Sequence, residues 1–192
     1  MTSSRREFIK AGVAGAAIAA TGLPAVSAAG AREQENEPLD ILILGGTGFI
    51  GPHMVREALR RGHSVTLFNR GRTNNELFPD LETIKGDRDG GLDGLNGRKW
   101  DSVIDNSGYI PRHVQDSARL FASSCDRYLF ISTVAVYADF SKPIDEDSPL
   151  ATIADESIEE VTWQTYGPLK ALCEKRAAAE IDADKPTIVY CA

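Results

Sequence analysis

The chain has 192 residues, room for one domain, and its 42% hydrophobic and 26% charged residues are ordinary for a globular protein. Lys and Arg total 21 against 28 Asp and Glu, a net charge of −7, which disfavours a general nucleic-acid binder because phosphate contacts need a basic face. The cysteines form no C-x-x-C pair and the histidines have no ligand-like spacing, which argues against a disulfide scaffold and a metal site.

The first residues differ in composition from the rest of the chain. Residues 4–10 are charged and contain Arg5 and Arg6, and an uncharged Ala/Gly-rich run follows from 11 to 29. Small residues at 26–28 offer a cleavage point, so the pattern predicts a signal peptide, with an uncleaved membrane anchor or a disordered start as alternatives. The paired arginines resemble the twin-arginine (Tat) export signal, which implies contact with the Tat machinery and a periplasmic or extracellular location.

Three segments follow from this reading: a Tat signal peptide over 1–28, a polar linker over 29–38 and a folded domain over 39–192. The domain alternates strand and helix patterns, which is typical of an α/β fold with a doubly wound parallel sheet. Strands are expected at 39–44, 64–68, 82–85, 102–105, 127–132 and 187–191, and helices at 52–61, 112–124 and 166–183.

A glycine-rich loop joins the first strand to the first helix. Gly45, Gly48 and Gly51 have G-x-x-G-x-x-G spacing: the first allows a tight turn, the second lets a pyrophosphate approach, and the third lets the helix pack closely. The helix N-terminus adds N–H donors and partial positive charge. A strand, a glycine loop and a helix in this order predict a dinucleotide site of the Rossmann type, in which Phe49 and Ile50 belong to the loop.

The end of the second strand bears on the choice of dinucleotide. Domains that prefer NAD usually have an acid here to hold the ribose 2′-hydroxyl, whereas this chain has Asn69 followed by Arg70 and Arg72. Arginine can pair with a 2′-phosphate, so NADP is favoured over NAD. The alternative is that both arginines are solvated loop charges.

A Tyr-x-x-x-Lys pair opens the last helix. The spacing of Tyr166 and Lys170 puts both side chains on one helix face, and Pro168 is compatible with the first turn. A nearby ammonium favours the phenolate, so Tyr166 is predicted to exchange a proton with a substrate hydroxyl, and Lys170 to bind the nicotinamide ribose. The alternative is an ordinary helix start with an exposed lysine.

Together these motifs resemble the short-chain dehydrogenase/reductase superfamily in its extended, epimerase/dehydratase-like branch. The loop reads GGTGFIG, the fifth strand ends in Ser-Thr-x-x-Val-Tyr, and Tyr-x-x-x-Lys follows in the expected order. The resemblance implies that Thr133 completes a Thr-Tyr-Lys site and that Asp87, after the third strand, meets the adenine. Ala138 stands where the family usually has glycine.

The resemblance predicts an NAD(P)-dependent oxidoreductase or epimerase/dehydratase acting on a sugar, a nucleotide sugar or a small hydroxyl or carbonyl compound. Two alternatives stay open. The segments 62–71 and 85–88 also resemble the chloroplast stem-loop-binding branch, which implies a non-catalytic dinucleotide- or RNA-binding protein. The second alternative is an inactive fragment, because the family adds a substrate lobe that is largely missing up to Ala192. A homodimer is expected only of a full-length protein.

Overall fold

A computed structural model of the chain describes residues 37–181 and 187–191. The predicted signal peptide and most of the predicted linker lie outside the described residues. The folded unit, Pro38–Ala192, has a single sheet flanked by helices. Within the described residues, no helix is long and apolar enough to span a membrane.

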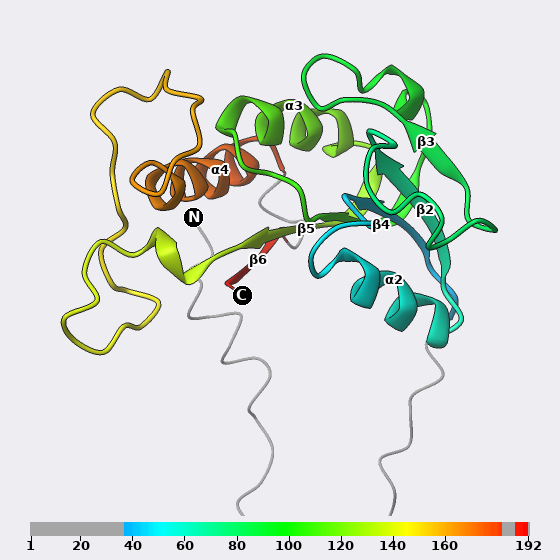
Figure 1. The fold of residues 1–192 in the computed structure, drawn as a ribbon, viewed down its shortest axis with the longest axis horizontal. Helices are drawn as coiled ribbons and strands as arrows, with labels where there is room; N and C mark the ends of the chain where they lie inside the picture. The colour runs from blue at the N-terminus through cyan, green and yellow to red at the C-terminus, as the bar shows by residue number, and fades with distance from the viewer. Residues whose placement is uncertain (1–36, 182–186, 192) are drawn as a thin grey trace, which may run out of the picture. The chain divides into compact units, whose positions relative to one another are not determined.

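The sheet has six parallel strands in the order β3-β2-β1-β4-β5-β6 (Figure 1). Their bounds are Asp40–Leu44 for β1, Ser64–Asn69 for β2, Thr83–Lys85 for β3, Trp100–Asp105 for β4, Cys125–Ser132 for β5 and Thr187–Cys191 for β6. The order changes direction between β1 and β4, and such a switch point at the carboxyl ends of the strands is where open α/β sheets bind ligands. The predicted α/β, doubly wound Rossmann architecture is confirmed.

Helices cover both faces of the sheet. Helix α2 (Gly51–Arg60) packs on one face, and α3 (Pro111–Phe121) and α4 (Tyr166–Glu180) lie side by side on the other (Figure 1). Alternate residues of β1 serve the two faces, which explains its nearly continuous apolar sequence. Leu42 and Leu44 join the core under α3 and α4, whereas Ile41 and Ile43 join the core under α2.

Local signals set the helix ends close to the predicted positions. Gly62 adopts a left-handed φ of 80° just after α2, and its N–H bonds to the carbonyl of Leu59, as in a glycine-terminated helix. Pro168 falls in the first turn of α4, as expected. That helix ends at Glu180 rather than at the predicted 183, because Ile181 turns to an extended conformation.

Candidate dinucleotide and catalytic site

The glycine loop has the geometry expected of a pyrophosphate cradle. Gly45 has a φ of 90°, where other residues are strained. A Cβ on Gly51 would lie 2.4 Å from the Gly45 carbonyl oxygen, so only glycine lets α2 begin this close to the turn. A Cβ on Gly48 would meet no atom within 4 Å. The two ends of the loop, at Gly45 and Gly51, therefore favour glycine, whereas the space beside Gly48 in its middle is free of protein atoms.

Three successive backbone N–H groups in the middle of the loop have no partner among the described residues. Among the described residues, no acceptor is recorded for the backbone N–H groups of Gly48, Phe49 and Ile50. Helix α2 also begins without a side-chain cap. Within the first turn of α2, the N–H groups of Gly51 and His53 are already bonded and Pro52 has none, so the unpaired donors are those of the loop. Unpaired N–H groups beside a helix N-terminus attract anions such as phosphate. The residues present thus suit a dinucleotide pyrophosphate.

A cavity of about 380 Å³ lies against the loop. Its walls come from the glycine loop, the segments that follow β2 and β3, and the turn between β4 and α3. All of these lie at the carboxyl ends of the strands, where the topology predicts a ligand.

Several predicted cofactor residues line this cavity. Phe49, Arg70 and Asp87 do so with Gly45 and Gly48. Ile50 and Gly51 do not, because they form the first turn of α2 behind the loop.

The turn after β2 is held by the residue that replaces the usual acid. The side chain of Asn69 accepts a hydrogen bond of 2.8 Å from the N–H of Gly71. Arg70 and Arg72 are exposed at the cavity, and neither has an ion pair with another described residue. Both guanidinium groups are therefore available to an anion.

The predicted pair, Tyr166 and Lys170, lies next to Tyr109, a residue that was not predicted from the sequence. The ring of Tyr109 lies 6.3 Å from that of Tyr166, and the Lys170 Nζ lies 5.5 Å from the centroid of the Tyr109 ring. Tyr109 also lines the cavity, whereas Tyr166 and Lys170 do not. Tyr109 thus stands between the cavity and the predicted catalytic pair.

Lys170 is buried, with 4% of its surface exposed. Its Nζ donates to the carbonyls of Gly108 at 2.8 Å and Ile131 at 2.6 Å, and lies 4.1 Å from the centroid of the Phe130 ring. Burial lowers the pKa of Lys170, although Cys173 and Asp105 oppose the shift. Cys173 is fully buried in the core, and burial raises the pKa of its thiol to about 12. This thiol is therefore protonated at neutral pH.

The two hydroxyl residues at the end of β5, Ser132 and Thr133, are both buried. The Oγ1 of Thr133 accepts a hydrogen bond of 3.2 Å from the N–H of Ala135 and so caps the short 3₁₀ helix η2 (Val134–Val136). The Ser132 hydroxyl is buried with no hydrogen-bond partner in the described part of the chain. The carbonyl of Ala135 lies against Gly167 in the first turn of α4, where a Cβ would approach it to 2.2 Å. This contact brings the Thr133 segment next to Tyr166.

A buried ionic network under the cavity was missed by sequence reasoning. Arg88 lines the cavity but is only 7% exposed, and its guanidinium forms a two-pronged ion pair with the fully buried Asp105. The Tyr128 hydroxyl donates to the same carboxylate at 2.7 Å. Burial raises the pKa of Asp105, but the charge and hydrogen bonds of Arg88 outweigh it, so the carboxyl pKa is lowered.

His113 is largely buried beside the cavity. Its side chain is 16% exposed, its carbonyl accepts from Arg88, and it lines the cavity. Burial and the neighbouring Arg112 lower its pKa. No group of three or more metal-ligating residues occurs among the described residues.

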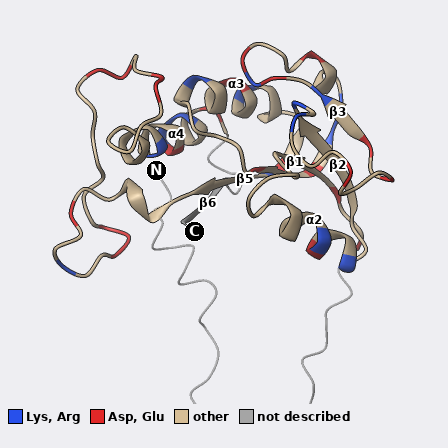
Figure 2. Ribbon diagram, viewed as in Figure 1, with Lys and Arg blue, Asp and Glu red and all other residues tan. Residues whose placement is uncertain are grey.

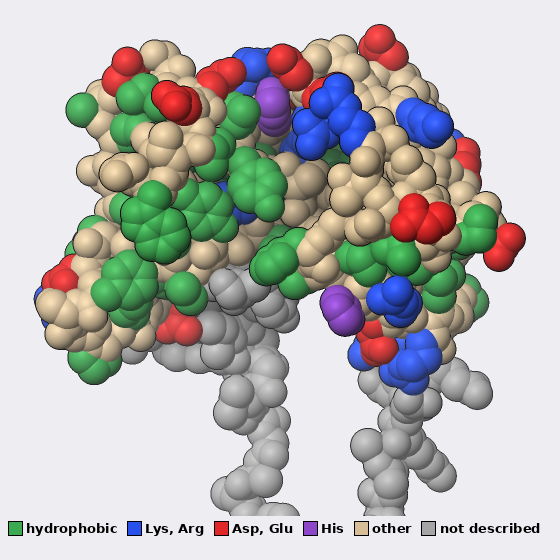
Figure 3. Space-filling view, viewed as in Figure 1, with side chains coloured by type: hydrophobic (Ala, Val, Ile, Leu, Met, Phe, Trp, Pro, Cys, Tyr) green, Lys and Arg blue, Asp and Glu red, His purple; other side chains and the backbone are tan. Residues whose placement is uncertain are grey.

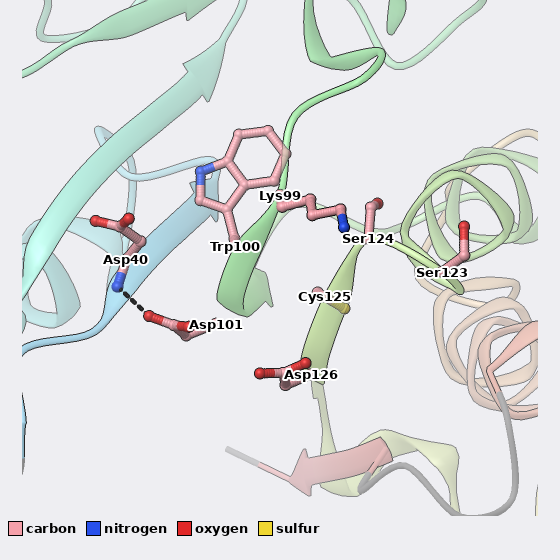
Figure 4. Close-up of a pocket in the computed structure, with 8 residues that line it drawn as sticks. All are labelled: Asp40, Lys99, Trp100, Asp101, Ser123, Ser124, Cys125 and Asp126. Carbon is pink, nitrogen blue, oxygen red and sulfur yellow. Dashed lines mark hydrogen bonds between the residues drawn. The ribbon is translucent and has the colours of Figure 1, made fainter.

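A second cavity, of about 300 Å³, lies at the opposite edge of the sheet (Figure 4). Asp40, Asp101 and Asp126 line it together with Lys99, and the Asp40 N–H donates to Asp101 at 2.7 Å. These residues lie at the amino ends of β1, β4 and β5, away from the glycine loop. We assign no function to this cavity.

Hydrophobic side chains gather on the face of the molecule that carries the predicted catalytic residues. Figure 3 shows them between α4 and the segment that follows β5. Exposed members of this class include Tyr109 at 44%, Val134 at 50% and Trp163 at 93%. Catalytic and binding grooves commonly combine such apolar walls with a few polar groups.

Comparisons with known proteins agree with this geometry. Residues 41–90 match the model of the NAD dependent epimerase/dehydratase family. A curated UDP-glucose 4-epimerase from Neisseria meningitidis is 28% identical over 166 residues, which cover 71% of this chain and 46% of that protein. The chloroplast stem-loop binding protein of 41 kDa b from Arabidopsis thaliana is 30% identical over 126 residues, covering 56% of this chain and 33% of that protein.

The fold resembles that of the Bordetella bronchiseptica enzyme WbmG, whose crystal structure contains NAD and UDP. The two share 22% identity at a TM-score of 0.61, over 79% of this chain and 52% of that one. The chain spans between a third and half of the length of these curated relatives. Residues 41–90 are thus similar to the NAD dependent epimerase/dehydratase family, and the fold of the described residues is similar to that of WbmG.

Proposed function

We propose that the chain binds a nicotinamide dinucleotide at the glycine loop and uses Thr133, Tyr166 and Lys170 to act on a sugar, a nucleotide sugar or a small hydroxyl or carbonyl compound. The reaction class is that of an oxidoreductase or an epimerase/dehydratase. The observation that carries the proposal is Tyr109, which lines the dinucleotide cavity and contacts both Tyr166 and Lys170.

When bound, the nicotinamide ring would accept or return a hydride. The residues of the chain transfer the proton of the substrate hydroxyl and hold the substrate and the ribose in position. Tyr166, half-buried at the start of α4, exchanges a proton with the substrate hydroxyl. Lys170 is fixed by its two carbonyl acceptors, which leaves one of its N–H donors for the ribose. Thr133 holds the substrate oxygen.

NADP is the proposed cofactor, and its preference over NAD is tested by calorimetry. A charge-assisted contact contributes about 1.5–3 kcal/mol, so Arg70 is expected to favour NADP by at least about tenfold. Replacing Arg70 with alanine should erase much of that gap while leaving the affinity for NAD nearly unchanged. Arg98→Ala, which removes an exposed arginine paired with Glu82 outside the cavity, is the matched control. Equal affinities of the unchanged protein for NADP and NAD would refute the assignment.

Export by the Tat pathway to the periplasm or the exterior is proposed from Arg5 and Arg6, which precede the uncharged Ala/Gly run. Replacing both arginines with lysine is expected to hold the precursor in the cytoplasm, as measured by cell fractionation. Arg32→Lys, in the predicted linker, controls for the loss of an arginine. Normal export of the double variant would contradict the Tat assignment.

RNA binding is a second candidate, favoured only by the identity to the stem-loop binding protein. The distribution of charge weighs against it. Basic and acidic residues lie side by side at the end of α2 (Figure 2), where Arg60 and Arg61 both pair with Glu57. Arg119 pairs with Glu180 and Arg176 with Glu156. A gel shift that weakens steeply with salt would support RNA binding, because each phosphate contact releases counterions.

A further inference from the structure

The buried Arg88 connects three separate walls of the dinucleotide cavity. It follows β3 in the sequence, and its guanidinium reaches Asp105 at the end of β4 and the first two turns of α3. Its Nη1 donates to the Ser107 hydroxyl at 3.3 Å, and its Nη2 to the His113 carbonyl at 3.1 Å and the Ser117 hydroxyl at 2.7 Å. Arg88, Ser107 and His113 all line the cavity.

Asp105 fixes the turn that faces the glycine loop. Besides Arg88, its carboxylate accepts from the Ser107 N–H at 3.3 Å and from the Tyr128 hydroxyl at 2.7 Å. The next residue, Asn106, donates through its side chain to the Gly45 carbonyl at 3.1 Å. Ser107 also packs closely against Gly45, where a Cβ on the glycine would approach its Cβ to 2.7 Å. A shift of this turn would therefore move one wall of the cavity against the loop.

The same turn is held from its other side by the predicted catalytic lysine. Lys170 donates to the carbonyl of Gly108, three residues after Asp105. The turn is thus held at one end by the Arg88–Asp105 ion pair and at the other by the hydrogen bond from Lys170 to Gly108. The strand itself is held by its neighbours, because β4 pairs with β1 over Ser102–Asp105 and with β5 over Trp100–Asp105.

We propose that Arg88, through its ion pair with Asp105, is a positioning residue that holds the Ser107 and His113 walls for the adenosine half of the dinucleotide. The inference rests on the proposed dinucleotide function. Arg88 is assigned to the adenosine half for two reasons. It lines the same wall of the cavity as Asp87, and it follows β3, which neighbours the strand that leads to Arg70 and lies on the opposite side of the sheet from the Tyr166 site.

Shape explains why an arginine is used here. Its planar guanidinium presents donors in a fixed fork and can serve a carboxylate, a hydroxyl and a carbonyl at once. A lysine at position 88 keeps the charge opposite Asp105 but cannot satisfy Ser107 and His113 from the same position. The conservative variant therefore separates positioning from charge balance.

The test measures binding rather than turnover. Arg88→Lys is titrated by calorimetry with NADP and, separately, with the adenosine bisphosphate that forms one half of NADP. Losing one charge-assisted hydrogen bond corresponds to about tenfold, and we expect both ligands to lose affinity by the same factor of at least this size. Arg98→Lys, at the exposed Glu82 pair, is the matched control and is expected to bind as the unchanged protein does.

A double variant tests whether a loss of affinity comes only from an unpaired buried charge that destabilises the fold. Arg88→Met with Asp105→Leu removes both charges, and such apolar replacements of buried pairs are often neutral for stability. Because Tyr128 and the Ser107 N–H also lose their acceptor, we expect it to unfold below the unchanged protein but above Asp105→Leu alone, and to show the same loss of affinity.

Two results would overturn the inference. One is unchanged binding by a folded Arg88→Lys variant, and the other is full affinity in the double variant, which would limit the pair to stability. If the unchanged protein binds neither ligand, the proposed function itself fails.

Discussion

Replacing Tyr166 with phenylalanine is expected to lower turnover by about 10²–10⁴-fold, the usual contribution of a general acid–base group. The variant keeps the ring that contacts Tyr109 and removes only the hydroxyl to which we assign the proton exchange. Dinucleotide affinity should stay nearly unchanged, because Tyr166 does not line the cavity. The measurement is single-turnover nicotinamide absorbance with a nucleotide sugar such as UDP-glucose as the probe, together with a separate titration of the dinucleotide.

Tyr109→Phe is the matched variant for this experiment. Tyr109 lies between the cavity and Tyr166, and burial is the largest cause of the raised pKa of its hydroxyl, which makes it a poorer base at neutral pH. We therefore expect a smaller loss of turnover from Tyr109→Phe than from Tyr166→Phe. The reverse order would assign the proton transfer to Tyr109.

Replacing Asp105 alone with leucine is expected to destabilise the fold by about 3–5 kcal/mol, because it leaves the buried charge of Arg88 without its partner. Tyr128 and the Ser107 N–H would lose their acceptor as well. The free energy of unfolding is measured by urea denaturation. Glu82→Leu, which breaks the exposed pair with Arg98, should cost no more than about 1 kcal/mol.

The Arg88–Asp105 ion pair also makes the free energy of unfolding depend on pH. The pKa of Asp105 in the folded protein lies below its value in the unfolded chain, so the unfolded state binds a proton more readily. Its stabilising contribution is therefore present above the unfolded pKa and is lost as the pH falls through the folded pKa. In Arg88→Met with Asp105→Leu, this part of the acid dependence should disappear. An acid unfolding profile identical to that of the unchanged protein would contradict the assignment.

Much of the scaffold could be predicted because its signals are local. The apolar run at 39–44 has the pattern of a strand buried on both faces, and β1 is buried in this way. Gly45 and Gly51 have the strained turn and the close contact that glycine spacing implies. Such features depend on a few neighbouring residues, so the sequence is sufficient to locate them.

The buried network could not be predicted for the opposite reason. Arg88 and Asp105 are 17 residues apart, and Tyr128 lies 23 residues beyond Asp105. Charged residues are seldom buried unless paired, so each is by default a surface residue until the fold supplies its partner. Tyr109 likewise gains its position only when α4 packs beside α3. A partial signal was present, since Asp105 directly ends a strand whose preceding residues are largely apolar.

We expect the open middle of the glycine loop to hold a dinucleotide pyrophosphate, and the Gly48→Ala variant tests this directly. A Cβ at Gly48 would meet no protein atom within 4 Å, and replacing glycine restricts the unfolded chain, so stability should be unchanged or slightly higher. One methyl group in the path of the pyrophosphate should cost about 1.5–3 kcal/mol of binding, or roughly ten- to 150-fold in affinity. Gly51→Ala is the control, because its Cβ would lie 2.4 Å from the Gly45 oxygen and should destabilise the fold itself. We predict that calorimetric titration with NADP shows tight binding to the unchanged protein and a loss of at least about tenfold in a fully folded Gly48→Ala variant. Equal affinity in the two proteins would contradict the account.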